Sequence, residues 1–328
     1  MTGPLRVAPS VPWQAFSAIA TGCLSLDWAL GCGGFPRGQV LEIFGPPDCG
    51  KTVLGLEALA AAQRMGGVGA FLDAEHALDA RWAATVGVRT EDLLYATPSG
   101  TGEALTMVIA LVKTCAVDLI VLDSVAALGP DTQQGRRGSS STGHGDLDFW
   151  TFAHGLRTLH HLVRRSACCV IFLNQTRSKL STDCGSQERT PGQPALPNFA
   201  SLRVRMERRA TLTIAEQPAG SRVWLRVIKS PYWMTPREAA LEIYANSGIS
   251  READLLALGR RAGIVAGDRD GLWMESDWLG ANAEQARGTL LSDRQRYRAL
   301  SDVLRDRAGL APLPVAAGNR ASGVAAGS

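Results

Sequence analysis

Four segments in the first half of the chain carry the apolar pattern of strands. Residues 39–44 form the first of these segments, and residues 67–73, 117–124 and 168–174 are apolar almost throughout. Apolar residues at helical spacing predict helices over residues 21–30, 53–65, 75–86, 102–115 and 156–165. Strands that alternate with helices and are apolar on both faces are typical of parallel sheets. We therefore predict an α/β fold with a mainly parallel central sheet flanked by helices.

The second half of the chain departs from this alternation. Strands predicted at residues 202–208, 210–215 and 222–228 follow one another without helices between them, which favours antiparallel pairing. From about residue 250 the pattern indicates a smaller α/β unit, which includes a charged helix near residues 293–306.

The chain is thus expected to have four parts. Residues 21–249 form the main core, and residues 250–306 form a small C-terminal α/β domain. Residues 1–20 contain prolines and show no helical period, so we expect a poorly ordered lead-in. Residues 307–328 are rich in Ala, Gly and Pro, which predicts a disordered tail.

Two long stretches inside the core fit neither a helix nor a strand. Residues 130–148 and 176–197 are polar and rich in Gly, Ser or Pro. Loops of this length within a compact domain are usually functional or disordered.

Composition limits the cellular compartments and the partners that we expect for the protein. The chain has 328 residues, of which 45% are hydrophobic, and its formal net charge of +3 says little about partners. Its seven cysteines are scattered without metal-ligand spacing, and an odd number argues against a disulfide framework. There is no signal segment and no apolar run long enough to cross a bilayer. We expect a reduced, cytoplasmic setting with no membrane partner.

The most specific motif follows the first strand. It has the pattern G-x-x-x-x-G-K-T, a phosphate-binding loop whose backbone N–H groups form an anion nest. Lys51 is expected to reach the β- and γ-phosphates, and the hydroxyl of Thr52 is expected to bind Mg²⁺. The helix after the loop would add its positive N-terminal dipole. The expected nucleotide-binding residues are Gly45, Pro46, Pro47, Asp48, Cys49, Gly50, Lys51, Thr52 and Val53.

Three polar residues lie at or just after the ends of predicted strands, where ligands bind in parallel sheets. Asp123 follows a bulky apolar run, the Walker B pattern, and is expected to hold Mg²⁺, with helix capping as the alternative. Glu75 could polarise an attacking water, or be an exposed residue in the first turn of a helix. Gln175 could sense a γ-phosphate and signal to the loop after it, or cap backbone groups at the strand end.

A basic segment surrounds the second loop. Between residues 156 and 210 there are ten Lys or Arg side chains against three acids. Such a segment suits a phosphate backbone, although a charge run by itself is more often a solvated face. The candidate DNA contacts in the two loops are Arg136, Arg137, Arg177, Lys179 and Arg189.

Several motifs in combination resemble the bacterial RecA recombinase family. The matching stretches are the segment from residue 21 through the phosphate-binding loop, 73–79 (DAEHALD), 121–128 (VLDSVAAL), 172–175 (FLNQ), 199–203 (FASLR) and 227–229 (VIK). The resemblance covers about residues 21–306 and is far more specific than a phosphate-binding loop alone. It implies a RecA-type P-loop ATPase core with a small C-terminal α/β domain.

The resemblance also implies a role for each matching residue. The phosphate-binding loop would bind ATP, with Lys51 among the catalytic residues, and Asp123 would bind Mg²⁺. Glu75 would be the catalytic carboxylate, and Gln175 would be the γ-phosphate switch for the loop that follows. Residues 130–148 and 176–197 match the two DNA-binding loops of the family.

Three further positions concern the nucleotide. Asp79 would contact the adenine amino group. Trp82 stands where the family usually has a tyrosine stacked on adenine, and an indole can serve the same purpose. Lys229 matches a lysine that reaches across a subunit interface to the ATP of a neighbour. RecA filaments bind single-stranded DNA, exchange strands with a homologous duplex and trigger the SOS response.

The sequence also departs from the family pattern. Only some twenty residues precede the match, whereas the family has a longer region with a helix that docks on the next subunit. Pro231 replaces a second interface lysine, and Cys184 replaces the usual aromatic tip of the second loop. Pro194 and Pro197 would stiffen a loop that should reorder on ATP binding. The acidic C-terminal tail of the family is also missing.

Three interpretations remain open. The first is a DNA-dependent ATPase of DNA repair and recombination, as a diverged paralog with impaired self-polymerisation. The second is a regulatory or accessory protein that modulates a RecA filament or serves a translesion polymerase complex, as ImuA-type proteins do. The third is a RecA-fold ATPase that acts on something other than DNA, which the motif at residues 73–79 and Leu128 disfavour. We favour the diverged paralog.

Overall fold

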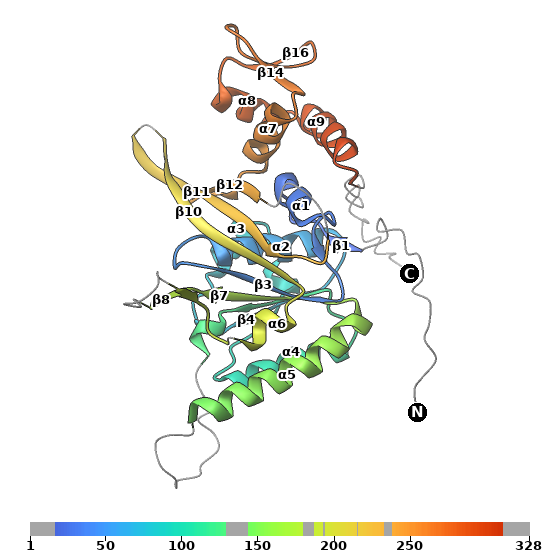
Figure 1. Cartoon of the computed structure of the whole chain (residues 1–328). Coiled ribbons are helices and arrows are strands. Elements are labelled where there is room, and N and C mark those ends of the chain that lie inside the picture. The colour runs from blue at the N-terminus through green and yellow to red at the C-terminus, as the bar shows by residue number, and fades with distance from the viewer. Residues whose placement is uncertain are drawn as a thin grey trace, which may run out of the picture.

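A computed structural model describes residues 17–128, 144–179, 187–192, 194–214, 216–232 and 238–310, without the side chains of residues 144–150, 177–179 and 187–189. In this part of the chain, a large core surrounds one sheet and a smaller unit follows toward the C-terminus (Figure 1). The predicted α/β fold, with a mainly parallel central sheet flanked by helices, is confirmed.

One nine-stranded sheet runs through the core in the order β13-β12-β11-β10-β3-β7-β6-β4-β5. Its strands are β3 (Gln39–Gly45), β4 (Gly69–Asp73), β5 (Leu94–Ala96), β6 (Leu119–Asp123), β7 (Cys169–Gln175), β10 (Leu202–Ile214), β11 (Gln217–Lys229), β12 (Glu238–Tyr244) and β13 (Gly248–Ile249). Neighbouring strands from β10 to β5 are parallel. The strands from β10 to β13 pair antiparallel, as the absence of helices between them predicts.

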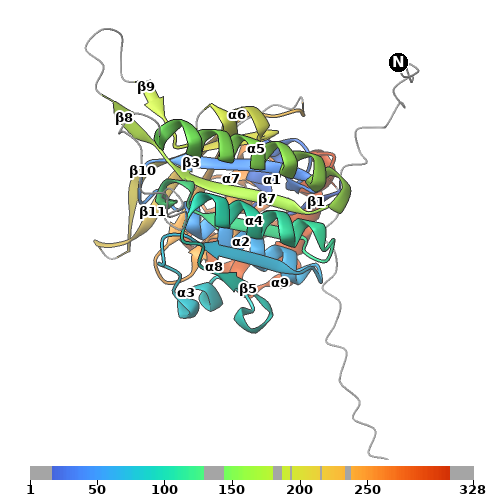
Figure 2. The same ribbon diagram turned by 90° about the horizontal axis from the view of Figure 1, so that it is seen from below.

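Helices cover both faces of the sheet and create two apolar layers. The first layer contains α1 (Leu24–Leu30), α2 (Lys51–Arg64) and α3 (Ala80–Thr85), and the second contains α4 (Thr101–Lys113), α5 (His144–Ser166) and α6 (Ala195–Phe199). Figure 2 shows α4 and α5 lying over the sheet. Val121 and Ile171 point into the first layer, whereas Ile120 and Val170 point into the second. Because both faces are buried, these strands must be apolar along their whole length.

Strand β10 corrects one sequence-based boundary. The pattern predicts two strands over residues 202–208 and 210–215, but the structure has a single strand, Leu202–Ile214. A register shift between Arg208 and Ala210 marks a β-bulge. Because a bulge leaves one residue unpaired, it interrupts the alternation of side chains that the sequence pattern relies on. With β11, β10 extends beyond the sheet as a long hairpin (Figure 1).

Two helices have bounds that differ from the prediction. Helix α5 begins at His144, well before the predicted start. The sequence prediction began the helix too late because Gly145 and Gly155 resemble helix breaks. Helix α3 covers only Ala80–Thr85. The residues before it stay out of the helix because the Asp73 carboxylate accepts hydrogen bonds from the backbone N–H groups of Ala77 (3.2 Å) and Leu78 (2.9 Å).

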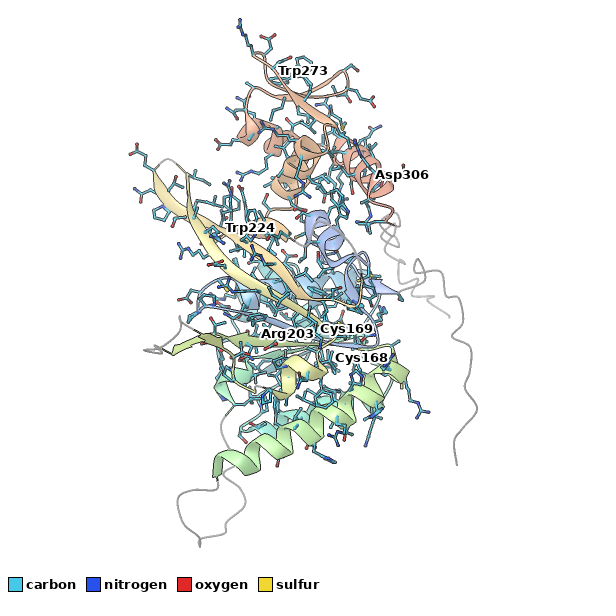
Figure 3. The ribbon with its side chains drawn as sticks, viewed as in Figure 1. Cys168, Cys169, Arg203, Trp224, Trp273 and Asp306 are labelled. Atoms are coloured by element: carbon cyan, nitrogen blue, oxygen red, sulfur yellow. The ribbon has the colours of Figure 1, made fainter. Side chains whose placement is uncertain are left out.

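The C-terminal unit has its own apolar core. Its elements are α7 (Arg251–Arg261), α8 (Ala283–Ser292), α9 (Arg294–Arg307), β14 (Val265–Gly267), β15 (Leu272–Met274) and β16 (Asp277–Gly280). The three strands form an antiparallel sheet, and Figure 3 shows Trp273 of β15 at the far end of the unit. Leu24 of α1 is buried in the same cluster of apolar side chains, which joins the unit to the core.

Smaller elements complete the described chain. They are β1 (Ala18–Ile19), β2 (Phe35–Pro36), β8 (Arg177–Lys179), β9 (Gln187–Arg189) and the 3-10 turns Thr90–Asp92 and Val125–Ala127. Residues 1–16 of the expected lead-in lie outside the described residues, but Ile19 is fully buried within β1. At the other end, α9 includes Arg307 and Leu310 packs against the C-terminal core, whereas residues 311–328 lie outside the described part.

Glu42 is a fully buried carboxylate in the central strand β3. Its Oε2 atom accepts a hydrogen bond from Nε of Arg203 on β10 at 2.6 Å, and its Oε1 atom accepts one from Nδ2 of Asn174 on β7 at 2.9 Å. The Arg203 guanidinium also lies over the ring of Phe44, 4.6 Å from its centroid. Figure 3 shows Arg203 within the core. A buried charge is tolerated only when it is paired in this way.

We predict that Arg203→Met lowers the free energy of unfolding by about 3 to 5 kcal/mol, because it leaves the Glu42 carboxylate buried without a cation. Arg226→Met is a matched control, since Arg226 pairs with Glu238 at a similar distance of 2.7 Å but is 55% exposed. The control should cost less than about 1 kcal/mol. Urea unfolding followed by tryptophan fluorescence measures both losses. Equal losses of unfolding free energy in the two variants would show that the burial of Glu42 does not determine how much the ion pair contributes to stability.

Candidate nucleotide-binding site

A cavity of about 420 Å³ lies at the carboxyl ends of the central strands, beside the start of α2. The residues from Pro47 to Val53 line it, as do Glu75, Trp82, Asp123 and Gln175. The structure therefore brings the phosphate-binding loop together with the three polar residues that the sequence places at or after strand ends. This is the edge of a parallel sheet at which ligands generally bind.

The shape of the loop explains its two glycines. Gly50 has a φ angle of 89°, a conformation that other residues adopt only with strain. A Cβ atom at Gly45 would overlap the carbonyl oxygen of Met206 on β10, so only glycine allows the two strands to approach. Helix α2 begins at Lys51, and its first N–H groups have no partners within the helix. These groups and the helix dipole favour an anion at this position.

Lys51 is 7% exposed, and its ammonium group stays close to the loop. Its Nζ atom donates to the carbonyl oxygens of Pro46 at 2.7 Å and Gly45 at 3.3 Å. The sulfur of Cys49 is 3.7 Å from the same atom. A triphosphate would offer this ammonium charged acceptors, which bind more strongly than neutral carbonyls.

Thr52, in the first turn of α2, faces Asp123 at the end of β6. The Thr52 hydroxyl donates to Oδ2 of Asp123 at 2.5 Å. Burial raises the pKa of Asp123 to about 6, and the nearby carboxylates of Glu75 and Asp73 add to the rise. The hydrogen bond from Thr52 and the charge of Lys51 act in the opposite direction.

This pair of oxygen donors fits Mg²⁺. Magnesium usually takes one or two protein oxygens and completes its shell with water and phosphate oxygens. Among the described residues there is no group of three or more His, Cys, Asp or Glu side chains that could hold a metal ion. A divalent cation beside Asp123 would also compensate the negative charge that raises its pKa.

Glu75 lies beyond the end of β4 and is held by two partners. Its Oε1 atom accepts hydrogen bonds from the Ser124 hydroxyl and from Nε2 of Gln175, the latter at 2.9 Å. The backbone N–H of Glu75 donates to the carbonyl oxygen of Asp123 at 3.2 Å, which ties the turn after β4 to β6. Glu75 does not occupy the first turn of a helix, because α3 begins only at Ala80.

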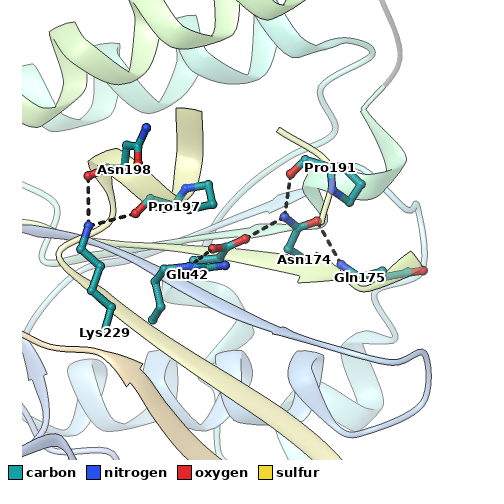
Figure 4. Close-up of polar contacts among 8 residues, drawn as sticks. Glu42, Asn174, Gln175, Pro191, Pro197, Asn198 and Lys229 are labelled. Atoms are coloured by element: carbon teal, nitrogen blue, oxygen red, sulfur yellow. Dashed lines mark hydrogen bonds and ion pairs between the residues drawn. The ribbon is translucent and has the colours of Figure 1, made fainter. Parts of the chain in front are cut away.

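Gln175 ends β7 next to a buried amide that sequence reasoning did not single out. Asn174 is fully buried and donates from Nδ2 to Glu42 and to the carbonyl oxygen of Pro191, both at 2.9 Å. Its Oδ1 atom accepts from the backbone N–H of Gln175 at 3.0 Å (Figure 4). One side chain thus joins the cavity edge, the central strand and the second loop. The sequence signal for this role was the presence of a polar residue, Asn174, within an otherwise apolar strand.

Residues of α3 and β12 also line the cavity. Trp82 of α3 lines the cavity, but Asp79 caps that helix, accepting hydrogen bonds from the backbone N–H groups of Arg81 (2.8 Å) and Trp82 (3.2 Å). Asp79 is not among the lining residues in the described part of the chain. Tyr244, at the end of β12, does line the cavity and was missed. The alternation over residues 238–244 was the signal for this strand.

Lys229 lies at the opposite end of β11 from Gly220 and therefore away from this cavity. Its Nζ atom donates to the carbonyl oxygens of Pro197 at 2.9 Å and Asn198 at 3.1 Å (Figure 4). Partial burial and the neighbouring Arg203 guanidinium lower the pKa of Lys229. Its predicted role toward the ATP of a neighbouring subunit stays a prediction.

The predicted DNA contacts lie in or beside parts of the chain that are not described. Arg136 and Arg137 fall outside the described residues. Arg177 and Lys179 belong to β8 and Arg189 to β9, and these two strands form an antiparallel ribbon directly after Gln175. Their side chains are not described, so the contacts stay predictions.

Some members of the basic segment have structural partners. Arg203 pairs with Glu42 at 2.6 Å, and Arg205 and Arg209 both pair with Glu207, at 3.2 and 3.0 Å. These side chains stabilise the sheet and its hairpin. The segment is therefore only partly a candidate nucleic-acid surface.

No helix in the described residues is both long and apolar enough to cross a membrane. The model of the RecA N-terminal domain family matches residues 9–250. The chain is 42% identical over 309 residues to Protein RecA of Geobacter metallireducens, which covers 93% of this chain and 90% of the relative. It is 43% identical over 274 residues to Protein RecA of Chloroflexus aggregans, covering 83% of this chain and 77% of the relative.

The family match spans most of the core, and the alignments with the relatives continue across most of both chains. The matched range includes the residues that meet at the cavity, from the phosphate-binding loop to Gln175. On these grounds the chain belongs to the bacterial RecA family.

Proposed function

We propose that this protein binds and hydrolyses ATP with Mg²⁺, in a manner that depends on single-stranded DNA, and that it acts in DNA repair and recombination. The observation that carries the proposal is the meeting of Lys51, Thr52, Asp123, Glu75 and Gln175 at one cavity. The family relationship supports the same activity.

Each side chain has a chemical task in this proposal. Lys51 holds the β- and γ-phosphates, and Thr52 and Asp123 hold Mg²⁺, which neutralises charge on the phosphates when bound. Glu75 orients and polarises the attacking water. Its hydrogen bonds to Ser124 and Gln175 fix the carboxylate at the cavity edge.

Gln175 is the proposed link between nucleotide and DNA. Its amide binds Glu75 at the cavity, and its backbone N–H binds Asn174, which also holds Pro191 of the second loop. A γ-phosphate that attracts the Gln175 amide would therefore alter contacts at the start of β8 and at Pro191. The loop residues Arg177, Lys179 and Arg189 would then contact the phosphate backbone of DNA together with Arg136 and Arg137 of the first loop.

We further propose that the protein is a diverged paralog with impaired self-polymerisation. The supporting observation is Pro231, which stands two residues after Lys229 where the family has a second interface lysine. A proline offers no cation to a neighbour's γ-phosphate. The same observation favours a second candidate function, an accessory protein that modulates a RecA filament or a translesion polymerase complex.

The first test measures ATP hydrolysis with and without single-stranded DNA, followed by light scattering for filaments. We expect hydrolysis that DNA stimulates, with little added scattering, because one interface cation is missing. Binding of ATP without stimulated turnover would favour the accessory function. Large assemblies in the presence of ATP and DNA would contradict the proposed loss of self-polymerisation.

Lys51→Ala should abolish measurable ATP binding, because the phosphates lose their main cation. Lys113→Ala is the matched control, since Lys113 is exposed at the end of α4. Equilibrium titration with a fluorescent ATP analogue distinguishes the two variants. Retained affinity in the Lys51 variant would overturn the assignment of the phosphate site.

Reversing the charge of Arg136, Arg137, Arg177 and Lys179 should remove salt-sensitive binding of single-stranded DNA. The control reverses the same number of exposed charges elsewhere, at Lys113, Arg269, Arg294 and Arg298. Fluorescence anisotropy of a labelled oligonucleotide over a series of salt concentrations measures the effect. If the loop variant and the control bound DNA equally well, the loop assignment would be wrong.

A further inference from the structure

Tyr244 stands between the nucleotide cavity and the C-terminal domain. It is the last residue of β12 and is 9% exposed. Tyr244 lines the nucleotide cavity and also borders a second cavity, which Arg287 of α8 lines from the C-terminal domain. Tyr244 is therefore common to both cavities.

Arg287 holds the Tyr244 ring in two ways. The guanidinium carbon lies 4.7 Å from the ring centroid, a cation–π distance, and Nη1 donates a hydrogen bond to the Tyr244 hydroxyl. That hydroxyl donates in turn to Oε2 of Glu242 at 3.0 Å. Burial and the hydrogen bond to Glu242 raise the pKa of Tyr244, so the phenol keeps the proton that it donates.

Glu242 closes the network on the side of the sheet. Its Oε1 atom binds Nη2 of Arg222 on β11 at 2.6 Å, and its Oε2 atom lies 4.0 Å from Nη1 of Arg287. Both Arg287 and Glu242 have side chains that are at least three-quarters buried, at 25% and 20% exposure. Water therefore screens this contact less than an ion pair on an open surface.

The two ends of the network belong to different parts of the molecule. Tyr244 is fixed in the core sheet, where it pairs with Gly220 of β11 and Gly248 of β13. Arg287 is fixed in the C-terminal domain, because its neighbours on α8, Ala286 and Leu290, are buried in that domain's core. A shift of the domain must therefore move the Arg287 guanidinium relative to the Tyr244 ring.

Other contacts between the two parts lie away from the cavity. Arg251 of α7 binds Glu57 of α2 at 2.6 Å, and Asp254 accepts from the backbone N–H of Ser25 at 3.1 Å. Neither Glu57 nor Ser25 lines the nucleotide cavity. These contacts attach the domain, whereas the Arg287 contact also reaches the wall of the site.

We propose that Arg287 is a positioning residue that orients Tyr244 at the nucleotide cavity. Through this contact it couples ATP binding to the position of the C-terminal domain relative to the core. The inference rests on the proposed binding of ATP. Such coupling is reciprocal: a domain position that keeps Arg287 on Tyr244 favours the nucleotide, and the nucleotide favours that domain position.

The test is Arg287→Leu in the full chain. We expect about fivefold to tenfold weaker binding of a fluorescent ATP analogue with Mg²⁺, at the lower end of typical coupling between sites. In the wild type, saturating ATP should also slow hydrogen exchange of the α8 amides, and this response should disappear in the variant. A purely structural role would lower the unfolding midpoint and leave both readouts unchanged.

Two further variants sharpen the experiment. Arg298→Leu makes the same change at an exposed site of α9 and should leave affinity and α8 exchange as in the wild type. Tyr244→Phe keeps the ring but removes the hydroxyl, so it should lose the exchange response even if Arg287→Leu does not fold. Wild-type affinity and a normal α8 response in Arg287→Leu, or a normal response in Tyr244→Phe, would overturn the inference alone. Failure of the wild type to bind ATP would overturn the proposed function, and the inference with it.

Discussion

The geometry of the site depends on the contacts that the buried Glu42 carboxylate makes with Arg203 and Asn174. The carboxylate is fully excluded from water, and a cation from β10 and an amide from β7 satisfy its two oxygens. Because an unpaired buried charge costs several kcal/mol, strand registers that separate these partners are strongly disfavoured. Gly45 follows Glu42 by three residues, and Gln175 directly follows Asn174. The register that satisfies the carboxylate therefore also sets where the phosphate-binding loop begins and where Gln175 ends β7.

The same sheet explains how one site draws on distant parts of the sequence. Its parallel half gathers the loop, Asp123 and Gln175 at one edge, since parallel strands all end on the same side. Its antiparallel half folds back beside that edge and adds Gly220 and Tyr244 to the wall. The C-terminal unit contacts this antiparallel half through Arg287 and Tyr244, and it contacts α1 through the apolar cluster around Leu24. The cavity, the strand end that leads into the second loop and the contacts of the C-terminal unit thus all involve the same nine-stranded sheet.

The sequence predicted the parts of this arrangement whose physics is local. Strands that are buried on both faces must be apolar throughout, and a phosphate-binding loop requires its glycines, so both can be read directly. What the sequence could not reveal were side-chain partners far apart in the chain. Arg203 belongs to the basic segment that the sequence analysis linked to a phosphate backbone, but its charge pairs with Glu42, about 160 residues earlier. Likewise, Tyr244 reaches the cavity only through the pairing of β11 with β12, and the start of α3 depends on the hydrogen bonds of the Asp73 side chain.

Strand β11 gives the proposed divergence a physical basis. One end of this strand, at Gly220, borders the chain's own nucleotide cavity, and the other end carries Lys229. If Lys229 serves a neighbour's ATP, the strand divides the two tasks between its ends. Under that proposal, Pro231 lies beyond the end that would face the neighbour, and the cavity lies at the other end of the strand. The proposed ATP binding within one chain and the proposed cooperation between chains would therefore depend on opposite ends of β11, so that one could be lost without the other.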